Sequence, residues 1–231
     1  MLCCPAGGDP GGDSGHFPQE EVVMYKKQLK IQKIVCLLSL VVAVILFLYA
    51  LGIMTDLYDS LYSALRIRVE EDSEAANGYT ITATERSVPG AMVYFNMQDF
   101  NKTFVSCSIV YIVLAALLYV TNTSTRRRYY ISNYISIGLV AVASLAIPIY
   151  AHSQIEAYKA QFLQIDFAAL KEYSNTFGTL YTESTMWFDL HYFVFALMIL
   201  VGAALVGVCA WKVVLMREES RLVEEGKKVK V

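Results

Sequence analysis

Charged residues are missing from four long stretches of this 231-residue chain, although they occur throughout the rest of it. The uncharged windows are residues 34–55, 103–125, 129–151 and 190–211, with 22, 23, 23 and 22 residues. Roughly 20 apolar residues are enough for a helix to cross the hydrocarbon of a bilayer. Proton relays and voltage sensors need charged residues inside the membrane. The absence of charge from these windows therefore disfavours a pump or a proton-coupled transporter.

Cysteine is missing where a small extracellular domain would need it. The five cysteines are Cys3 and Cys4 near the N-terminus and Cys36, Cys107 and Cys209 inside three of the uncharged windows. The connecting segments 56–102 and 152–189 therefore fold without disulfides. No stretch matches a catalytic, metal-binding or nucleotide-binding pattern, so no enzyme activity, cofactor, metal site or nucleic-acid partner is predicted.

The overall composition is that of a protein in lipid. Hydrophobic residues make up 56% of the chain and charged residues 17%, and the mean hydropathy is +0.44. Soluble domains average about 45–50% apolar and 25% charged residues. Four uncharged windows in one small chain leave too little polar surface for a soluble bundle. We therefore expect an all-α membrane protein, a bundle of four transmembrane helices, with the lipid bilayer as its first partner.

Basic residues are distributed unevenly along the chain, and this sets the expected orientation. If the N-terminus is cytoplasmic, 13 of the 19 lysines and arginines lie inside and 6 lie outside. The run 126–128 consists of three arginines in a very short loop, where the positive-inside rule holds best. Both termini are therefore expected in the cytoplasm, with the plasma membrane favoured over an internal membrane. The first 33 residues lack the apolar region of a cleavable signal peptide, so the first span is expected to direct insertion.

The windows divide the chain into tails, spans and loops. Residues 1–20 are rich in Gly and Pro and are predicted to be a disordered cytoplasmic tail. The remaining segments are a juxtamembrane helix and first span at 21–54, a large outer loop at 55–102, a second span at 103–125, a basic cytoplasmic loop at 126–128, a third span at 129–151, a helical outer loop at 152–189, a fourth span at 190–211 and a cytoplasmic tail at 212–231.

The two outer loops are predicted to form a small mixed extracellular cap. Tyr79–Thr84 alternates and is rich in β-forming residues, which predicts a short strand, and Ala91–Phe95 is a candidate partner strand. His152–Tyr173 carries an apolar stripe at helical spacing, which predicts an outward extension of the third helix. Because an apolar stripe in water is costly, the first loop is expected to cover it.

Small residues on two spans offer faces on which helices can approach closely. They are Gly138, Ala141 and Ser144 on the third span and Gly202, Ala203, Gly207 and Ala210 on the fourth. Such faces pack either inside the bundle or against a partner, and the internal use is the preferred interpretation. Pro148 predicts a kink near the outer end of the third span.

Three short motifs are candidate modification or binding sites. Asn101 opens a sequon in the first outer loop, close to the second span, and is a candidate glycosylation site. Cys3 and Cys4 are candidate palmitoylation sites, since acylated cysteines commonly lie near a membrane face. The last three residues have the apolar-x-apolar form of a peptide that binds a PDZ groove, which makes a PDZ protein a predicted partner. They are Val229, Lys230 and Val231.

Two of the three histidines, His152 and His191, are expected at the outer membrane interface. With Glu183 and Asp189 nearby, they are candidates for a pH-sensitive or metal-binding cluster. Interfacial histidines are more often merely solvated, and solvation is the preferred interpretation.

The layout resembles that of the claudin and calcium-channel gamma-subunit group of tetraspan proteins. The shared features are cytoplasmic termini, a large first outer loop with strand character, a tiny basic inner loop, a third span extended outward and a tail that ends in valine. The chain departs from the group's pattern in the first outer loop, which has neither tryptophan nor cysteine. The resemblance implies a four-span bundle with an extracellular cap and a PDZ-binding tail.

These observations predict a non-enzymatic tetraspan membrane protein that acts through lateral and outer-face contacts, as an accessory subunit, adhesion or scaffold component. Its partner would be another membrane protein or a second copy of the chain. An alternative is a small pore or channel protomer that oligomerises, because hydroxyls and backbone carbonyls can line a pore. A third is a membrane-embedded enzyme, although the sequence shows no paired carboxylates, no nucleophile with a base and no phosphate-binding loop.

Overall fold

The computed structural model describes residues 19–54, 88–123, 131–177 and 181–224. Within these ranges the chain is helical apart from turns and short connections, and no strand is present. Four helices are long and one, α6, is short. Their bounds are α1 Gln19–Gly52, α4 Met92–Asn122, α5 Ile131–Phe162, α6 Phe167–Phe177 and α7 Met186–Glu224.

The long helices have the length and hydropathy of membrane spans. The apolar segments are Lys26–Gly52, Met92–Asn122, Ile131–Phe162 and Met186–Arg221. Each overlaps one of the uncharged windows in the sequence. The structure therefore supports the prediction of an integral, multi-pass membrane protein, with four helices that are long and apolar enough to cross a membrane.

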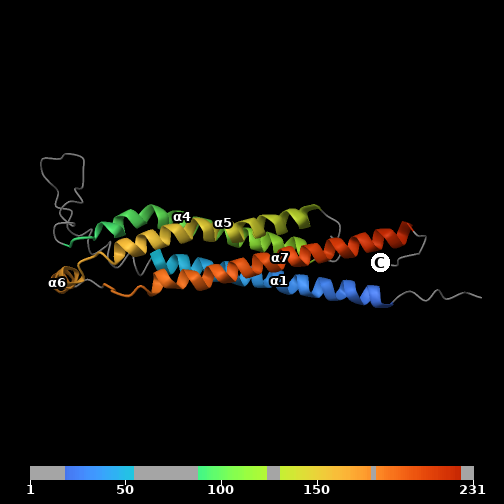
Figure 1. Cartoon of the computed structure of the whole chain (residues 1–231), viewed down its shortest axis with the longest axis horizontal. Coiled ribbons are helices and arrows are strands. Elements are labelled where there is room, and N and C mark those ends of the chain that lie inside the picture. The colour runs from blue at the N-terminus through green and yellow to red at the C-terminus, as the bar shows by residue number, and fades with distance from the viewer. Residues whose placement is uncertain (1–18, 55–87, 124–130, 178–180, 225–231) are drawn as a thin grey trace, which may run out of the picture.

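The four long helices lie side by side in one elongated bundle, each antiparallel to the next along the chain (Figure 1). α1 packs on α4 and α7, and α5 packs on the same two helices. One end of the bundle carries α6, together with the ends of α1 and α5 and the starts of α4 and α7; we call it the α6 end. The opposite end, with Gln19, Asn122, Ile131 and Glu224, is the tail end.

Large apolar side chains lie on the outer surface of the bundle as well as in its core. Ile149, Val142, Leu200 and Val120 are 74, 66, 65 and 63% exposed. A helix that is hydrophobic all round is either a buried helix of a large core or a membrane span. Since lipid tails are as apolar as these side chains, the bilayer accepts a surface that water would oppose.

Aromatic rings fill the core in the half of the bundle nearer the α6 end. Tyr49, Phe104 and Phe195 come from three different helices and meet edge to face, with centroids 5.9 to 6.5 Å apart. The hydroxyl of Tyr49 donates to the backbone oxygen of Trp187 at 3.0 Å. Gly52 allows Trp187 to lie against α1, because a Cβ at that position would come within 2.2 Å of the indole ring.

The strand predicted at Ala91–Phe95 is wrong, because these residues form the turn before α4 and its first helical turn. Gly90, with φ of 85°, makes that turn. Val93, Met97 and Phe100 recur at helical spacing and are only 2, 2 and 4% exposed, so burial along one helix face outweighs local β propensity. The strand predicted at Tyr79–Thr84 lies outside the described residues.

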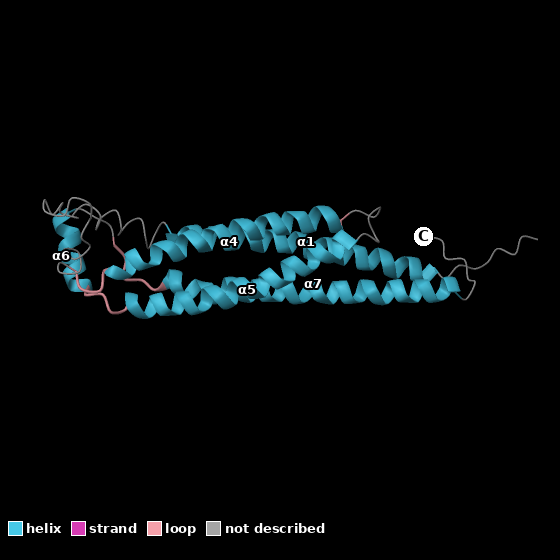
Figure 2. Ribbon diagram, turned by 90° about the horizontal axis from the view of Figure 1, so that it is seen from above, coloured by secondary structure: helices cyan, strands magenta, loops and turns pink. Residues whose placement is uncertain are grey.

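The third span does extend beyond the uncharged window, but less far than predicted. α5 continues through Pro148 and ends at Phe162, and the chain then turns before α6 begins at Phe167. Asp166 caps the new helix, since its Oδ1 accepts the backbone N–H groups of Ala168 and Ala169 at 3.0 and 3.1 Å. A single helix from His152 to Tyr173 is therefore wrong, and α6 lies across the end of the bundle instead (Figure 2).

The apolar stripe on the outer part of α5 is covered by neighbouring helices. Phe162 is fully buried, with its ring centroid 6.3 Å from that of Tyr94 on α4 and 5.1 Å from that of Phe188 on α7. The backbone N–H of Asp166 also donates to the carbonyl of Pro89 at 3.0 Å, which joins the turn after α5 to the turn before α4. The described residues thus close this end with helices and turns, and the predicted mixed cap with strands is not supported.

Candidate functional site

Neutral polar side chains from three helices form a buried network at the tail end of the bundle. The amide of Gln32 donates to the side-chain and backbone oxygens of Asn122, both at 3.0 Å. The amide of Asn122 donates in turn to Ser136 Oγ at 2.8 Å, and Gln28 donates to Gln32 at 2.8 Å. None of these four residues is more than 2% exposed. Their hydrogen bonds hold α1, α4 and α5 together. Because none of the four side chains is ionisable near neutral pH, they provide no acid or base.

A second polar contact lies midway along the interface of α5 with α4 and α7. The hydroxyls of Ser144 and Tyr111 are 2.8 Å apart and share a hydrogen bond. On the other side of Ser144 lies Gly202, where an added Cβ would be only 2.9 Å from the serine Cβ. The structure therefore brings two of the predicted small residues together inside the bundle, and Ala141 is half-buried beside them.

The other predicted small residues face away from the bundle. Gly138, Ala203, Gly207 and Ala210 are all exposed, and no atom of the part of the chain that the structure describes lies within 4 Å of a Cβ placed on either glycine. The three positions on α7 are four and three residues apart, which puts them on one helical face. We call Ala203, Gly207 and Ala210 the open α7 face. The predicted set is thus divided between internal packing and the outer surface.

Two histidines and a glutamate meet between α5 and α7 at the α6 end. His152 and Glu156 are one turn apart on α5, and His191 lies near the start of α7. The Nε2 atom of His191 is 2.8 Å from Nδ1 of His152 and 3.8 Å from Oε1 of Glu156. One possible ligand atom from each of the three residues lies within 4.8 Å of the others. Of the residues that the structure describes, this cluster is the one suited to a metal ion.

Hydrogen bonds determine which ring nitrogen of His191 has a lone pair that can accept a proton or bind a ligand. Its Nδ1 faces the backbone carbonyl of Phe188 at hydrogen-bond distance. A carbonyl can only accept, so Nδ1 carries the proton and Nε2 of the neutral ring has a free lone pair. That lone pair accepts the Nδ1–H of His152. Since His191 is fully buried and His152 is exposed, the cluster has one fixed ring and one ring that solvent can reach.

Charged and hydroxyl groups surround this cluster. The hydroxyl of Tyr192 donates to Oε1 of Glu156 at 2.8 Å. One turn further out on α5, Lys159 forms an ion pair with Asp189 on α7, with Nζ and Oδ1 2.5 Å apart. Asp189, predicted from the sequence as a neighbour of the histidines, is therefore engaged by lysine. Glu183 accepts a hydrogen bond from the hydroxyl of Tyr181 at 3.3 Å. The sequence analysis did not identify Glu156, although it lies one helical turn from His152.

The remaining candidate residues are distributed between the core and the undescribed parts of the chain. Asn101 lies inside α4 and is 2% exposed, and neither of its amide atoms has a hydrogen-bond partner among the described residues. A glycan on Asn101 would require this face of α4 to leave the core. The candidate palmitoylation residues and the candidate PDZ ligand lie outside the described residues. They are Cys3, Cys4, Val229, Lys230 and Val231.

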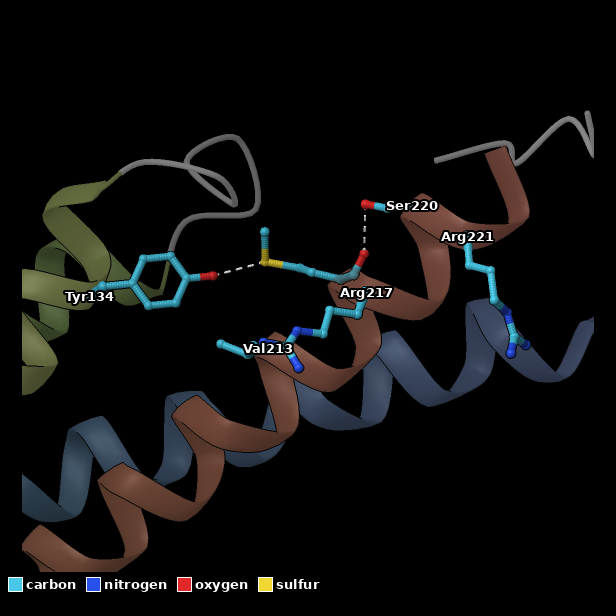
Figure 3. Close-up of a pocket in the computed structure, with 6 residues that line it drawn as sticks. Tyr134, Val213, Arg217, Ser220 and Arg221 are labelled. Atoms are coloured by element: carbon cyan, nitrogen blue, oxygen red, sulfur yellow. Dashed lines mark hydrogen bonds between the residues drawn. The ribbon is translucent and has the colours of Figure 1, made fainter. Parts of the chain in front are cut away.

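An open pocket of about 360 Å³ lies at the tail end between α5 and the final turns of α7 (Figure 3). Tyr134 reaches it from α5 and donates to the sulfur of Met216 at 2.8 Å. The α7 side contributes Arg217 and Arg221, and the second of these is paired with Glu218 at 3.2 Å. None of the sites predicted from the sequence lines this pocket.

Comparison with known proteins adds no assignment. No protein-family model matches the chain, and neither the curated proteins nor the solved structures include a match.

Proposed function

We propose that this chain is a non-enzymatic tetraspan protein of the plasma membrane, with cytoplasmic termini, that binds a transmembrane helix of another membrane protein along α7. It would act as an accessory or scaffold component of that complex. The observation that carries the proposal is the open α7 face, on which Ala203, Gly207 and Ala210 are exposed and Gly207 has free space around it.

The physical basis is the way in which helices associate in lipid. Without a hydrophobic force between apolar helices, association depends on close packing, which small residues permit. Large exposed side chains flank the open α7 face, among them Leu200, Val206 and Val214 at 65, 56 and 56% exposure. Small residues between large ones create a shallow groove into which the ridge of another helix fits. Another side of α7 uses Gly202 in the same manner against Ser144, which supports this interpretation.

The alternative, a pore, would have to lie between several copies of the chain. Tyr49, Phe104 and Phe195 occupy the centre of the bundle near the α6 end, so the interior of one copy is filled there. A second copy could also dock on the open α7 face. The test of the proposal must therefore identify what occupies that face.

The test compares two substitutions that each place a leucine on the lipid-facing surface. Gly207→Leu fills the open α7 face, whereas Val142→Leu adds one methylene to a position on α5 that is already 66% exposed. In native membranes, chemical crosslinking followed by native mass spectrometry should identify a larger membrane-protein partner for the wild type. Gly207→Leu should weaken this complex by about 1–2 kcal/mol, or roughly tenfold. Val142→Leu should leave it intact.

Two results would contradict the proposal. If Gly207→Leu retains the complex as well as Val142→Leu does, the open α7 face is not the binding surface. If the purified wild type forms symmetric homo-oligomers that conduct ions and has no other partner, the pore is the correct function.

A further inference from the structure

We propose that His152, Glu156 and His191 form a Zn²⁺ site that joins α5 to α7 at the α6 end of the bundle. The site lies away from the open α7 face and does not depend on the lateral contact proposed above. The orientation predicted from the basic residues would place it on the outer side of the membrane.

The ligand set fits zinc. Two imidazoles and one carboxylate form a recurrent protein set for Zn²⁺, with a fourth position left to water or to another ligand. Imidazole nitrogens favour zinc and its neighbours in the first transition series, whereas Mg²⁺ and Ca²⁺ favour oxygen ligands alone. His152 and Glu156 project from one helix one turn apart, and His191 faces them from the other. The ion would therefore hold two helices in one relative position.

Two of the three distances between the ligand atoms are close to those that a tetrahedral ion needs, and all three are within 4.8 Å. With Zn–N distances of about 2.0–2.1 Å, two ligands of a tetrahedral ion are roughly 3.3 Å apart. The two histidine nitrogens are 2.8 Å apart and the Glu156 oxygen is 3.8 Å from His191 Nε2. Binding would widen the first distance and shorten the second, each by about half an ångström. His152 is exposed, so its ring can make this adjustment without disturbing the core.

The protonation states also suit a metal ion. His191 is held by the Phe188 carbonyl with Nε2 unprotonated, the form in which imidazole binds a metal. His152 would release its Nδ1 proton from the hydrogen bond to His191 and carry a proton on Nε2 instead. Because His152 is exposed, water can exchange that proton. The bond between the two rings is thereby replaced by two bonds to one ion.

The surroundings of the site provide an outer shell of support. Tyr192 donates to Oε1 of Glu156 and so orients the carboxylate toward His191. Such outer-shell partners commonly contribute 10–100-fold to metal affinity. Lys159 is the nearest described cation on α5, and its ion pair with Asp189 offsets its repulsion of a bound ion. The negative charge of Glu156 is therefore available to the ion.

Zinc binding can be measured on the full-length chain in detergent after its metal has been stripped. Competition with a chromogenic zinc chelator gives affinity and stoichiometry, and the visible absorption of bound Co²⁺ reports whether the ion is tetrahedral. The wild type should bind one ion per chain. Glu156→Gln and His152→Ala should each lower the affinity at least about a hundredfold, since they remove ligands and not outer-shell partners. His16→Ala removes the remaining histidine and should have no effect.

The alternative to be separated is a purely structural hydrogen bond between the two histidines. In that case the wild type would bind no stoichiometric zinc, or Glu156→Gln and His152→Ala would bind it as tightly as the wild type does, and either result would overturn the proposal. A second readout uses stability. Zinc should raise the midpoint of thermal unfolding of the wild type and of His16→Ala, but not that of Glu156→Gln. Because Glu156→Gln nearly preserves the shape of the side chain, loss of folding is not expected to obscure the result.

Discussion

The two ends of the bundle both bury polar groups between helices, but the chemistry of those groups differs. At the tail end, amides and hydroxyls of Gln32, Asn122 and Ser136 bond mainly to one another, and solvent barely reaches them. At the α6 end, His152 and Glu156 keep one side open to solvent while His191 is fixed in the core. The neutral network therefore serves to position the helices. The ionisable cluster, because solvent can reach one side of it, retains the capacity to bind an ion.

Lipid explains why the tail-end network is so closely connected. A buried polar group without a partner is costly in an apolar medium, because no water is present to replace the missing bond. Asn122 meets this requirement through Gln32 on α1 and Ser136 on α5. The same bonds tie three helices to one register, since a shift of any helix would separate several pairs together.

The largest expected effect is therefore at the tail end. Asn122→Leu removes the side chain that connects α1, α4 and α5, and it leaves the amide of Gln32 with the backbone oxygen of residue 122 as the one remaining acceptor of the two. We expect the free energy of unfolding to fall by about 1–2 kcal/mol. Denaturant titration of the protein in mixed micelles, followed by helical circular dichroism, would measure this change.

The neighbouring residue Thr123 provides the control. Its hydroxyl donates to the carbonyl of Tyr119 in its own helix, at 2.8 Å, and within the described residues it bonds to no other helix. Thr123→Val should consequently leave the free energy of unfolding nearly unchanged. Equal losses in the two variants would mean that the bonds between helices do not specify the tail end, and the distinction between the two ends would fail.

The four long apolar helices could be predicted from the sequence because the absence of charge over some 20 residues is a direct requirement of a helix that crosses the bilayer. The ends of the helices could not be read from the same signal. α1 begins at Gln19 and α7 continues to Glu224, since helices extend beyond the apolar region on polar residues. Charge marks the limit of the hydrocarbon and not the limit of hydrogen-bonded backbone.

The error at Ala91–Phe95 has a related cause. Asp99 and Lys102 lie just before the uncharged window 103–125. The sequence pattern therefore separates Ala91–Phe95 from that window and indicates a short segment with β-forming side chains. In the structure, α4 carries these charges within a continuous helix. Val93, Met97 and Phe100 are buried at helical spacing. The sequence shows this spacing only if the helical periodicity of the window 103–125 is continued backwards across Asp99 and Lys102.

The candidate site was half visible in the sequence. His152 and His191 were expected at the same interface, and the spacing of Glu156 from His152 places both on one face of a helix. The direction of His191 could not be predicted, because it depends on the rotation of α7 against α5. That rotation is fixed by close contacts such as Gly202 with Ser144, which no local pattern specifies.

An intermediate effect is expected from the ion pair at the α6 end. Lys159→Met removes the partner of Asp189, and the two side chains are 23 and 48% exposed. Ion pairs with this degree of exposure contribute little to stability, and salt screens them. The loss of stability in Lys159→Met should thus be smaller than in Asn122→Leu and should shrink further at high salt. A loss that is as large as that of Asn122→Leu and independent of salt would contradict the comparison.

The smallest effect on stability, together with a moderate effect on zinc binding, is expected from Tyr192→Phe. Tyr192 is 54% exposed, and the substitution removes one hydrogen bond, to Glu156. Surface substitutions of this kind change the free energy of unfolding by at most about 0.5 kcal/mol. If the α6 end binds zinc, however, the carboxylate loses the group that orients it, and zinc affinity should fall about tenfold. Tyr150→Phe, which alters an exposed tyrosine on α5, should change neither quantity. Were Tyr192→Phe to bind zinc as tightly as the wild type while remaining equally stable, the hydroxyl would have no part in orienting Glu156, and the outer shell assigned to this end would be wrong.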